Sequence, residues 1–142
     1  MRVGHVIDSG GLYGAEAVVL NLCEALSRAG HPQTLVSLGE KGLSEKAIER
    51  EARGRGIDVR TMPASRFPSP STVLRLLRVL RAAEVDVVHL HGYKPDILLG
   101  FVPRRLRPAP TVATVHGSTH LGGLGRMAVY SWLDRLARRR LD

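Results

Sequence analysis

Histidines stand at the ends of two short apolar runs in this chain. His89 and His91 close one run, and His116 closes the next, where Gly117 and Ser118 follow. Alternation along an extended strand would place His89 and His91 on one face. A histidine at a strand end can exchange hydrogen bonds with substrate hydroxyls or ligate a metal. These residues therefore predict a polar binding site, with a structural histidine bonded to backbone as the alternative, above all for His89.

Metal binding is the less favoured use of these histidines. Only His89 and His91 have ligand-like spacing, whereas a zinc site needs a closed ligand set with supporting acidic residues. The chain has no cluster of aspartates to complete such a set. We therefore expect no metal ion, and a metal-dependent hydrolase is kept as an alternative class.

A glycine-rich loop follows the first apolar run and opens a helical pattern. Gly10, Gly11 and Gly14 permit positive φ and close approach of the backbone to a ligand, and a helix amino terminus attracts anions. We expect these glycines and Glu16 to contact substrate. The alternatives are a tight turn without a ligand and a Glu16 that only favours the helix dipole. The loop lacks the ending of a P-loop and has Ser9 where a dinucleotide fingerprint has its first glycine.

Apolar runs of strand length alternate with helical patterns along the whole chain, which predicts βαβ units around a parallel sheet. The expected strands are 2–8, 33–38, 57–62, 86–91 and 111–116. The expected helices are 14–28, 43–55, 73–83, 95–106 and 124 onward, with Ser71 or Thr72 as the cap of the third. Because open parallel sheets bind ligands beyond the carboxyl ends of their strands, the histidines and the glycine loop fall where a site is expected.

Composition indicates one globular domain. The chain has 142 residues, of which 44% are hydrophobic and 24% charged, and its apolar runs are too short to span a bilayer. It begins with a strand pattern instead of a secretory signal, so we expect a cytoplasmic protein. Cys23 lies on an apolar helical stripe and is expected in the core.

Basic residues give the chain a formal net charge of +8, which suits anionic partners. Aromatic residues make up only 4%, so there are too few stacking platforms for single-stranded nucleic acid, and we expect no nucleic-acid partner. On the helix 73–83, Arg75, Arg78 and Arg81 form a stripe that would suit peripheral contact with an anionic membrane. The alternative is a crossover helix that packs Leu77 and Leu80 on the sheet and leaves its arginines in solvent.

Three segments together resemble family-4 retaining glycosyltransferases: the glycine loop 10–16, the strand end 86–92 and the strand end 114–118. Their order and placement on successive strand ends are similar to that family over essentially the whole chain. The resemblance implies a GT-B architecture, in which two Rossmann-like domains face each other across a cleft. This chain would be the amino-terminal, acceptor-side half, with an open parallel sheet in the order 3-2-1-4-5 and helices on both faces.

The resemblance also implies roles for residues. His116 corresponds to a strand-end histidine near the transferred sugar and is the expected catalytic residue, and Gly11 lies in a loop that approaches the donor diphosphate or the acceptor. The expected substrate-binding residues are Gly10, Gly11, Gly14, Glu16, His89, His91, Gly117 and Ser118. Similar enzymes use no metal and no obvious protein nucleophile, so the nucleotide-sugar is a donor substrate and no cofactor is expected. Stabilisation of charge on the departing diphosphate would be the main catalytic effect.

The final helical pattern meets no terminating glycine or proline before Asp142. We expect a domain truncated near its carboxyl end, with the donor-binding domain absent and the isolated chain inactive. Apolar residues of this helix, such as Tyr130, Trp132 and Leu136, would then suit self-association. The alternative functions are a nicotinamide-binding Rossmann domain, for which Glu40 could bind ribose, and a non-catalytic binding module. The nicotinamide alternative does not account for the strand-end histidines.

Overall fold

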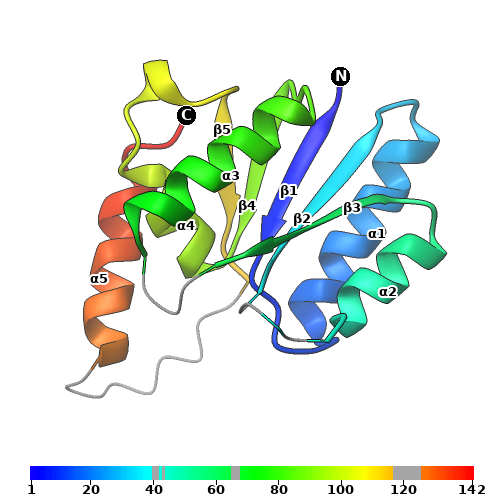
Figure 1. The fold of residues 1–142 in the computed structure, drawn as a ribbon, viewed down its shortest axis with the longest axis horizontal. Coiled ribbons are helices and arrows are strands. Elements are labelled where there is room, and N and C mark those ends of the chain that lie inside the picture. The colour runs from blue at the N-terminus through cyan, green and yellow to red at the C-terminus, as the bar shows by residue number, and fades with distance from the viewer. Residues whose placement is uncertain (40–41, 43, 65–67, 117–125) are drawn as a thin grey trace.

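The computed structural model describes residues 1–142 except 40–41, 43, 65–67 and 117–125. Its five strands form one parallel sheet in the order β3-β2-β1-β4-β5 (Figure 1). The strands are β1 (Val3–Ile7), β2 (Gln33–Gly39), β3 (Asp58–Pro63), β4 (Val87–His91) and β5 (Thr111–Thr114). The helices are α1 (Gly14–Arg28), α2 (Ala47–Gly54), α3 (Pro70–Ala82), α4 (Tyr93–Gly100), the 3-10 turn η1 (Arg104–Leu106) and α5 (Arg126–Arg138). The fold class and strand order expected from the sequence are confirmed.

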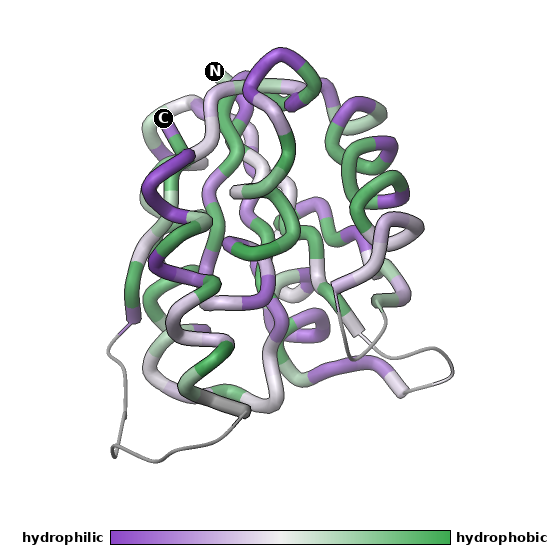
Figure 2. The backbone as a smooth tube through the Cα atoms, turned by 90° about the vertical axis from the view of Figure 1, so that its left-hand side faces the viewer, coloured by the Kyte–Doolittle hydropathy of each residue, from purple (hydrophilic) through white to green (hydrophobic). Residues whose placement is uncertain are grey.

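Helices cover both faces of this sheet, because a parallel sheet whose strands are apolar on both sides must bury both. Helices α1 and α2 pack on one face, where Val19, Leu20 and Cys23 of α1 meet Leu35 of β2. Cys23 is fully buried, which confirms its expected position in the core. This burial raises the pKa of its thiol to about 12. Along the helices in Figure 2, hydrophobic and hydrophilic stretches alternate, as expected for elements with one buried side.

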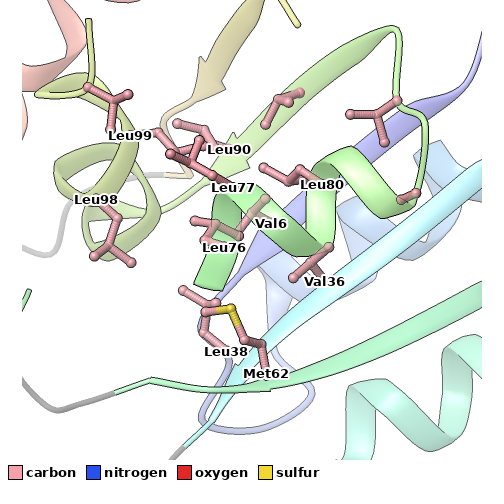
Figure 3. Close-up of a cluster of buried hydrophobic side chains, with 14 of the residues drawn as sticks. Val6, Val36, Leu38, Met62, Leu76, Leu77, Leu80, Leu90, Leu98 and Leu99 are labelled. Atoms are coloured by element: carbon pink, nitrogen blue, oxygen red, sulfur yellow. The ribbon is translucent and has the colours of Figure 1, made fainter. Parts of the chain in front are cut away.

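Helices α3 and α4 pack on the opposite face and form the larger core with it. Leu76, Leu77 and Leu80 of α3 lie beside strand residues in Figure 3. The labelled cluster comprises Val6, Val36, Leu38, Met62, Leu76, Leu77, Leu80, Leu90, Leu98 and Leu99. Leu77 and Leu80 are thus buried, and Arg75, Arg78 and Arg81 are exposed. The crossover packing of α3 that the sequence offered as an alternative is confirmed.

Several expected boundaries were wrong. Helix α3 begins at Pro70, and Ser69 is its cap in place of Ser71 or Thr72, because the Ser69 hydroxyl accepts a hydrogen bond from the Thr72 amide at 3.3 Å. Proline suits the first helical position, where an N–H has no partner within the helix. The expected helix 95–106 is two elements, α4 and η1, and α4 starts at Tyr93. Strand β5 ends at Thr114, so His116 follows the strand. No helix of the described residues is long and apolar enough to cross a bilayer.

Helix α5 docks on α4 at very close range. A Cβ built on Gly100 would lie 2.6 Å from both the Ala137 methyl group and the Ala137 carbonyl oxygen. Nearby, Asp96 is buried beside Asp134, and desolvation together with the Asp134 carboxyl raises the pKa of Asp96 to about 8. The outward side of α5 leaves Trp132 58% exposed. Self-association through this side remains a prediction.

The α4–α5 contact predicts different outcomes for two glycine-to-alanine substitutions. Gly100→Ala should lower the free energy of unfolding by about 1–3 kcal/mol, because the new methyl group overlaps a backbone atom that cannot move alone. Gly54→Ala in α2 is the matched control, since its Cβ would meet nothing within 4 Å. That control should be neutral or stabilising by up to about 1 kcal/mol. Urea denaturation followed by circular dichroism measures both, and equal midpoints for the two variants would refute the close contact.

Candidate functional site

Four imidazole rings lie together toward the carboxyl ends of β1, β4 and β5. His5 of β1 and His89 of β4 are partners in the strand register, and His91 follows two residues later on the same face. Ring centroids are 4.1 Å apart for His89 and His91, 5.3 Å for His5 and His91, and 5.2 Å for His91 and His116. The expected shared face of His89 and His91 is confirmed. His5 was missed, although a histidine inside an otherwise apolar strand was a visible signal.

Hydrogen bonds join three of these rings to a buried glutamine. Gln33 Oε1 lies 2.8 Å from His5 Nε2, His5 Nδ1 lies 3.0 Å from His91 Nε2, and His91 Nδ1 lies 2.9 Å from His116 Nε2. We call Gln33, His5, His91 and His116 the imidazole chain. His89 lies outside it and shares a 2.7 Å hydrogen bond with the Thr114 hydroxyl. Parallel pairing of β2, β1 and β4 brings these positions together from distant parts of the sequence.

Burial keeps the inner rings uncharged. His5 is 0% exposed and His91 2% exposed. Desolvation lowers the pKa of His5, and lowers that of His91 to about 2 with further lowering from the charges of the neighbouring histidines. Half-buried His89 has its pKa lowered to about 4 for the same reasons. At neutral pH each of these three rings is therefore neutral, with one nitrogen donating and the other accepting.

The same rings are close enough to be considered as metal ligands. His5, His89 and His91 each offer a nitrogen within 4.8 Å of the others. In the imidazole chain, however, both nitrogens of His5 and both of His91 already take part in hydrogen bonds. If His5 or His91 ligated a metal ion, the ion would have to replace at least one of these hydrogen bonds. The absence of a metal therefore stays a prediction, and the hydrogen-bonded arrangement is a competing use of the same nitrogens.

The glycine loop leaves β1 at the carboxyl edge of the sheet, at the lower end of the dark-blue strand in Figure 1. Gly10, Gly11 and Gly14 all have ordinary φ, so the positive φ offered as a reason for glycine at these positions is wrong. A Cβ on Gly11 would lie 2.7 Å from the Tyr13 ring, which is 71% exposed and would have to turn aside to make room for it. The Ser9 hydroxyl donates to the Gly11 carbonyl at 2.6 Å and accepts from its amide at 3.2 Å, which fixes the loop.

Glu16 has a structural partner in this loop. Its carboxylate accepts a hydrogen bond from the Tyr13 amide at 3.1 Å, and the side chain is buried. This contact satisfies an amide at the start of α1 that lacks a partner within the helix. The contact of Glu16 with substrate remains a prediction, as do those of the three loop glycines, His89 and His91. The expected site residues Gly117 and Ser118, and Glu40 of the nicotinamide alternative, lie outside the described residues.

A charged cluster at the same edge was not expected from the sequence. Asp8 follows β1, and its two carboxylate oxygens lie 3.2 Å from Lys46 Nζ and 2.8 Å from Lys94 Nζ. The lysine side chains are only 16% and 11% exposed. Two ammonium groups thus share the Asp8 carboxylate, while the carboxylates of Glu16 and Glu49 accept hydrogen bonds from backbone amides nearby. The two ammonium groups are the part of this edge that suits an anionic group such as a phosphate.

Because the buried histidines are neutral, we expect the free energy of unfolding to fall as the pH falls. Below about pH 6.5 the unfolded chain binds protons that folded His5 and His91 do not, so each histidine can cost up to about 1.4 kcal/mol per pH unit. Asp96 has the opposite effect, because its raised pKa favours the folded state as pH falls. We therefore compare wild type with His91→Asn, in which Asp96 is unchanged. Between pH 7 and 5.5 the variant should lose less unfolding free energy than wild type in urea titrations. Parallel losses in the two proteins would contradict the neutral state of His91.

Comparisons with known proteins agree with the fold described above. The sequence profile of Glycosyltransferase Family 4 matches residues 13–142. A search of curated proteins finds no match. Among solved structures, HepE from Anabaena superposes with a TM-score of 0.71 at 15% identity, over 98% of this chain and 35% of HepE. At that identity the likeness shows a shared fold, and the chain spans about a third of the length of HepE.

A second glycosyltransferase, the calicheamicin enzyme CalG4, is similar at 20% identity over 92% of this chain and 34% of its own. Its TM-score of 0.47 is too low to support a closer relation. Family membership rests on the profile match, which covers most of the chain, from Tyr13 at the start of α1 through α5, and leaves out β1, Gly10 and Gly11. The chain therefore belongs to glycosyltransferase family 4.

Proposed function

We propose that this chain is the acceptor-side, amino-terminal domain of a retaining glycosyltransferase of the hexosyltransferase class. The full protein would transfer a sugar from a nucleotide-sugar to a glycan, a lipid-linked acceptor or a small molecule. The observation that carries the proposal is the family match, together with histidines and a glycine loop at one sheet edge. HepE, whose structure holds UDP, is about three times as long as this chain, which supports a donor-binding domain elsewhere in a longer protein.

The proposed reaction takes place in a cleft between this domain and the donor domain. Sugar transfer with no metal and no protein nucleophile depends on stabilising the charge that develops on the leaving diphosphate. We expect Lys46 and Lys94, whose ammonium groups share the Asp8 carboxylate, to contribute to that stabilisation. The Gly11 amide, which donates to the Ser9 hydroxyl in this structure, would contribute only after giving up that bond. His116 would bind a hydroxyl of the transferred sugar or of the acceptor. The acceptor would lie along this same edge.

Transfer assays test this proposal on a longer protein that includes the second domain. Purified enzyme is incubated with a panel of nucleotide-sugars and candidate acceptors, with and without EDTA. At least one pair should give a product that keeps the anomeric configuration of the donor, and EDTA should not abolish the reaction. The 142-residue chain alone should give no product, because donor and acceptor must be held together in reactive geometry. Turnover by the isolated chain, or inversion at the anomeric carbon, would refute the assignment.

In the same assay, His116→Ala should lower turnover by roughly 10- to 1000-fold, the range from a lost polar contact to lost transition-state stabilisation. Arg105→Ala is the control, since Arg105 is exposed in η1, before β5 begins and away from the carboxyl ends of the strands. That variant should keep wild-type turnover. If folded His116→Ala is as active as the control, His116 has no part in the reaction.

We also propose a cytoplasmic protein that contacts an anionic membrane peripherally during the synthesis of cell-envelope glycans. Helix α3 supports a mainly electrostatic contact, because Arg75, Arg78 and Arg81 face solvent. Of its leucines, Leu76, Leu77 and Leu80 are used in the core and Leu74 is exposed. Each exposed cation near an anionic surface can contribute about 1 kcal/mol. The contact should therefore weaken strongly with salt.

Vesicle sedimentation measures this contact. The chain should bind anionic vesicles, release them in high salt and ignore neutral ones. Replacing Arg75, Arg78 and Arg81 by glutamine should abolish sedimentation. A control with the same change in net charge replaces three exposed arginines from other elements, Arg28, Arg50 and Arg104. Equal loss of binding in both variants would show that total charge, and not α3, attracts the vesicles.

A further inference from the structure

The orientation of one buried amide determines where the protons lie in the imidazole chain. Gln33 Nε2 donates to the His31 carbonyl at 2.6 Å, so Gln33 Oε1 faces His5 Nε2 at 2.8 Å. The opposite orientation would set the amide oxygen against the His31 carbonyl oxygen, and neither of these two atoms can donate a hydrogen bond. Because an amide oxygen only accepts, His5 carries its proton on Nε2.

The consequence passes from ring to ring. A neutral imidazole has one N–H, so His5 Nδ1 is an acceptor and the 3.0 Å contact requires the proton on His91 Nε2. His91 Nδ1 is then an acceptor as well, and the 2.9 Å contact requires the proton on His116 Nε2. The remaining nitrogen, His116 Nδ1, has no hydrogen-bond partner among the described residues.

We propose that Gln33, His5 and His91 are positioning residues that hold His116 in the tautomer with its proton on Nε2. In neutral His116, Nδ1 then carries a lone pair and accepts a hydrogen bond from a substrate hydroxyl. The part concerning substrate rests on the proposed function, whereas the tautomer is a property of the polypeptide without substrate. Gln33 closes the chain with an amide, which is not a base, so the chain fixes the direction of the hydrogen bonds and does not conduct protons away.

Ring-nitrogen NMR tests the tautomer directly. The chain is labelled with 15N-histidine, freed of metal by EDTA and measured at pH 7 by long-range proton–nitrogen correlation, which distinguishes N–H from bare ring nitrogens. His5, His91 and His116 should each show a protonated Nε2 and a bare Nδ1. Loss of one set of signals in His116→Gln assigns that ring. A proton on Nδ1 of any of the three in wild type overturns the proposal.

Two substitutions of Gln33 separate positioning from packing. Gln33→Met keeps the side-chain length but removes the acceptor, so the tautomer ratio at His116 should fall by roughly five-fold or more, the effect of one net hydrogen bond. Gln33→Glu keeps an acceptor oxygen toward His5 and, as the neutral acid, an O–H donor toward the His31 carbonyl, so it should retain the wild-type tautomer. Burial of this position favours the neutral acid, because desolvation disfavours a carboxylate. An unchanged His116 tautomer in folded Gln33→Met, or its loss in Gln33→Glu, would refute the positioning role.

These measurements use the chain without substrate, so they succeed or fail independently of sugar transfer. In the longer protein, Gln33→Met should lower kcat with little change in KM, and Gln33→Glu should restore most of the lost kcat. If the tautomer shifts as expected but kcat does not, the acceptor role of His116 Nδ1 is refuted. The tautomers inferred for the imidazole chain would not be affected by that result.

Discussion

Burial of His5 and His91 inside a parallel sheet makes every ring nitrogen depend on a neighbour within hydrogen-bond distance. An unpaired polar nitrogen in that environment would cost about 1–3 kcal/mol, so the register of the surrounding strands cannot slip without a penalty. A shift of one residue between β1 and β4 would send one set of rings to the other face of the sheet. Gln33, His5 and His91 are therefore part of the core and, in the proposed arrangement, also hold His116 in place.

The polar edge is assembled from several connections that follow different strands. The glycine loop follows β1 and is fixed by Ser9, Lys46 stands where α2 begins, and Lys94 lies in the first turn of α4. Asp8 links the two lysines across the edge of the sheet. Gly92, with φ of 92°, allows β4 to turn directly into α4 beyond His91. Under the proposed function, this edge would offer lysine ammonium groups and imidazole nitrogen to one ligand beyond the carboxyl ends of the strands.

Sequence reasoning reached the fold because its signals are local. Helix α1 has the bounds that its apolar stripe predicted, and each strand lies where an apolar run did. The site was reached only in part. His89, His91 and His116 were identified by their position at strand ends, but His5 and Gln33 were not. Their importance depends on which strands lie side by side and in what register, and no local pattern contains that information. The Asp8 bridge was missed for the same reason, since its partners come from α2 and α4.

We expect the reacting sugar to bind at this edge of the sheet, in contact with His116. A crystal structure of a longer protein with a nucleoside diphosphate and an acceptor analogue tests this most directly. A hydroxyl oxygen should lie about 2.6–3.2 Å from His116 Nδ1, with His116 Nε2 still bonded to His91. A complex in which the acceptor occupies another surface and His116 touches neither ligand would contradict it.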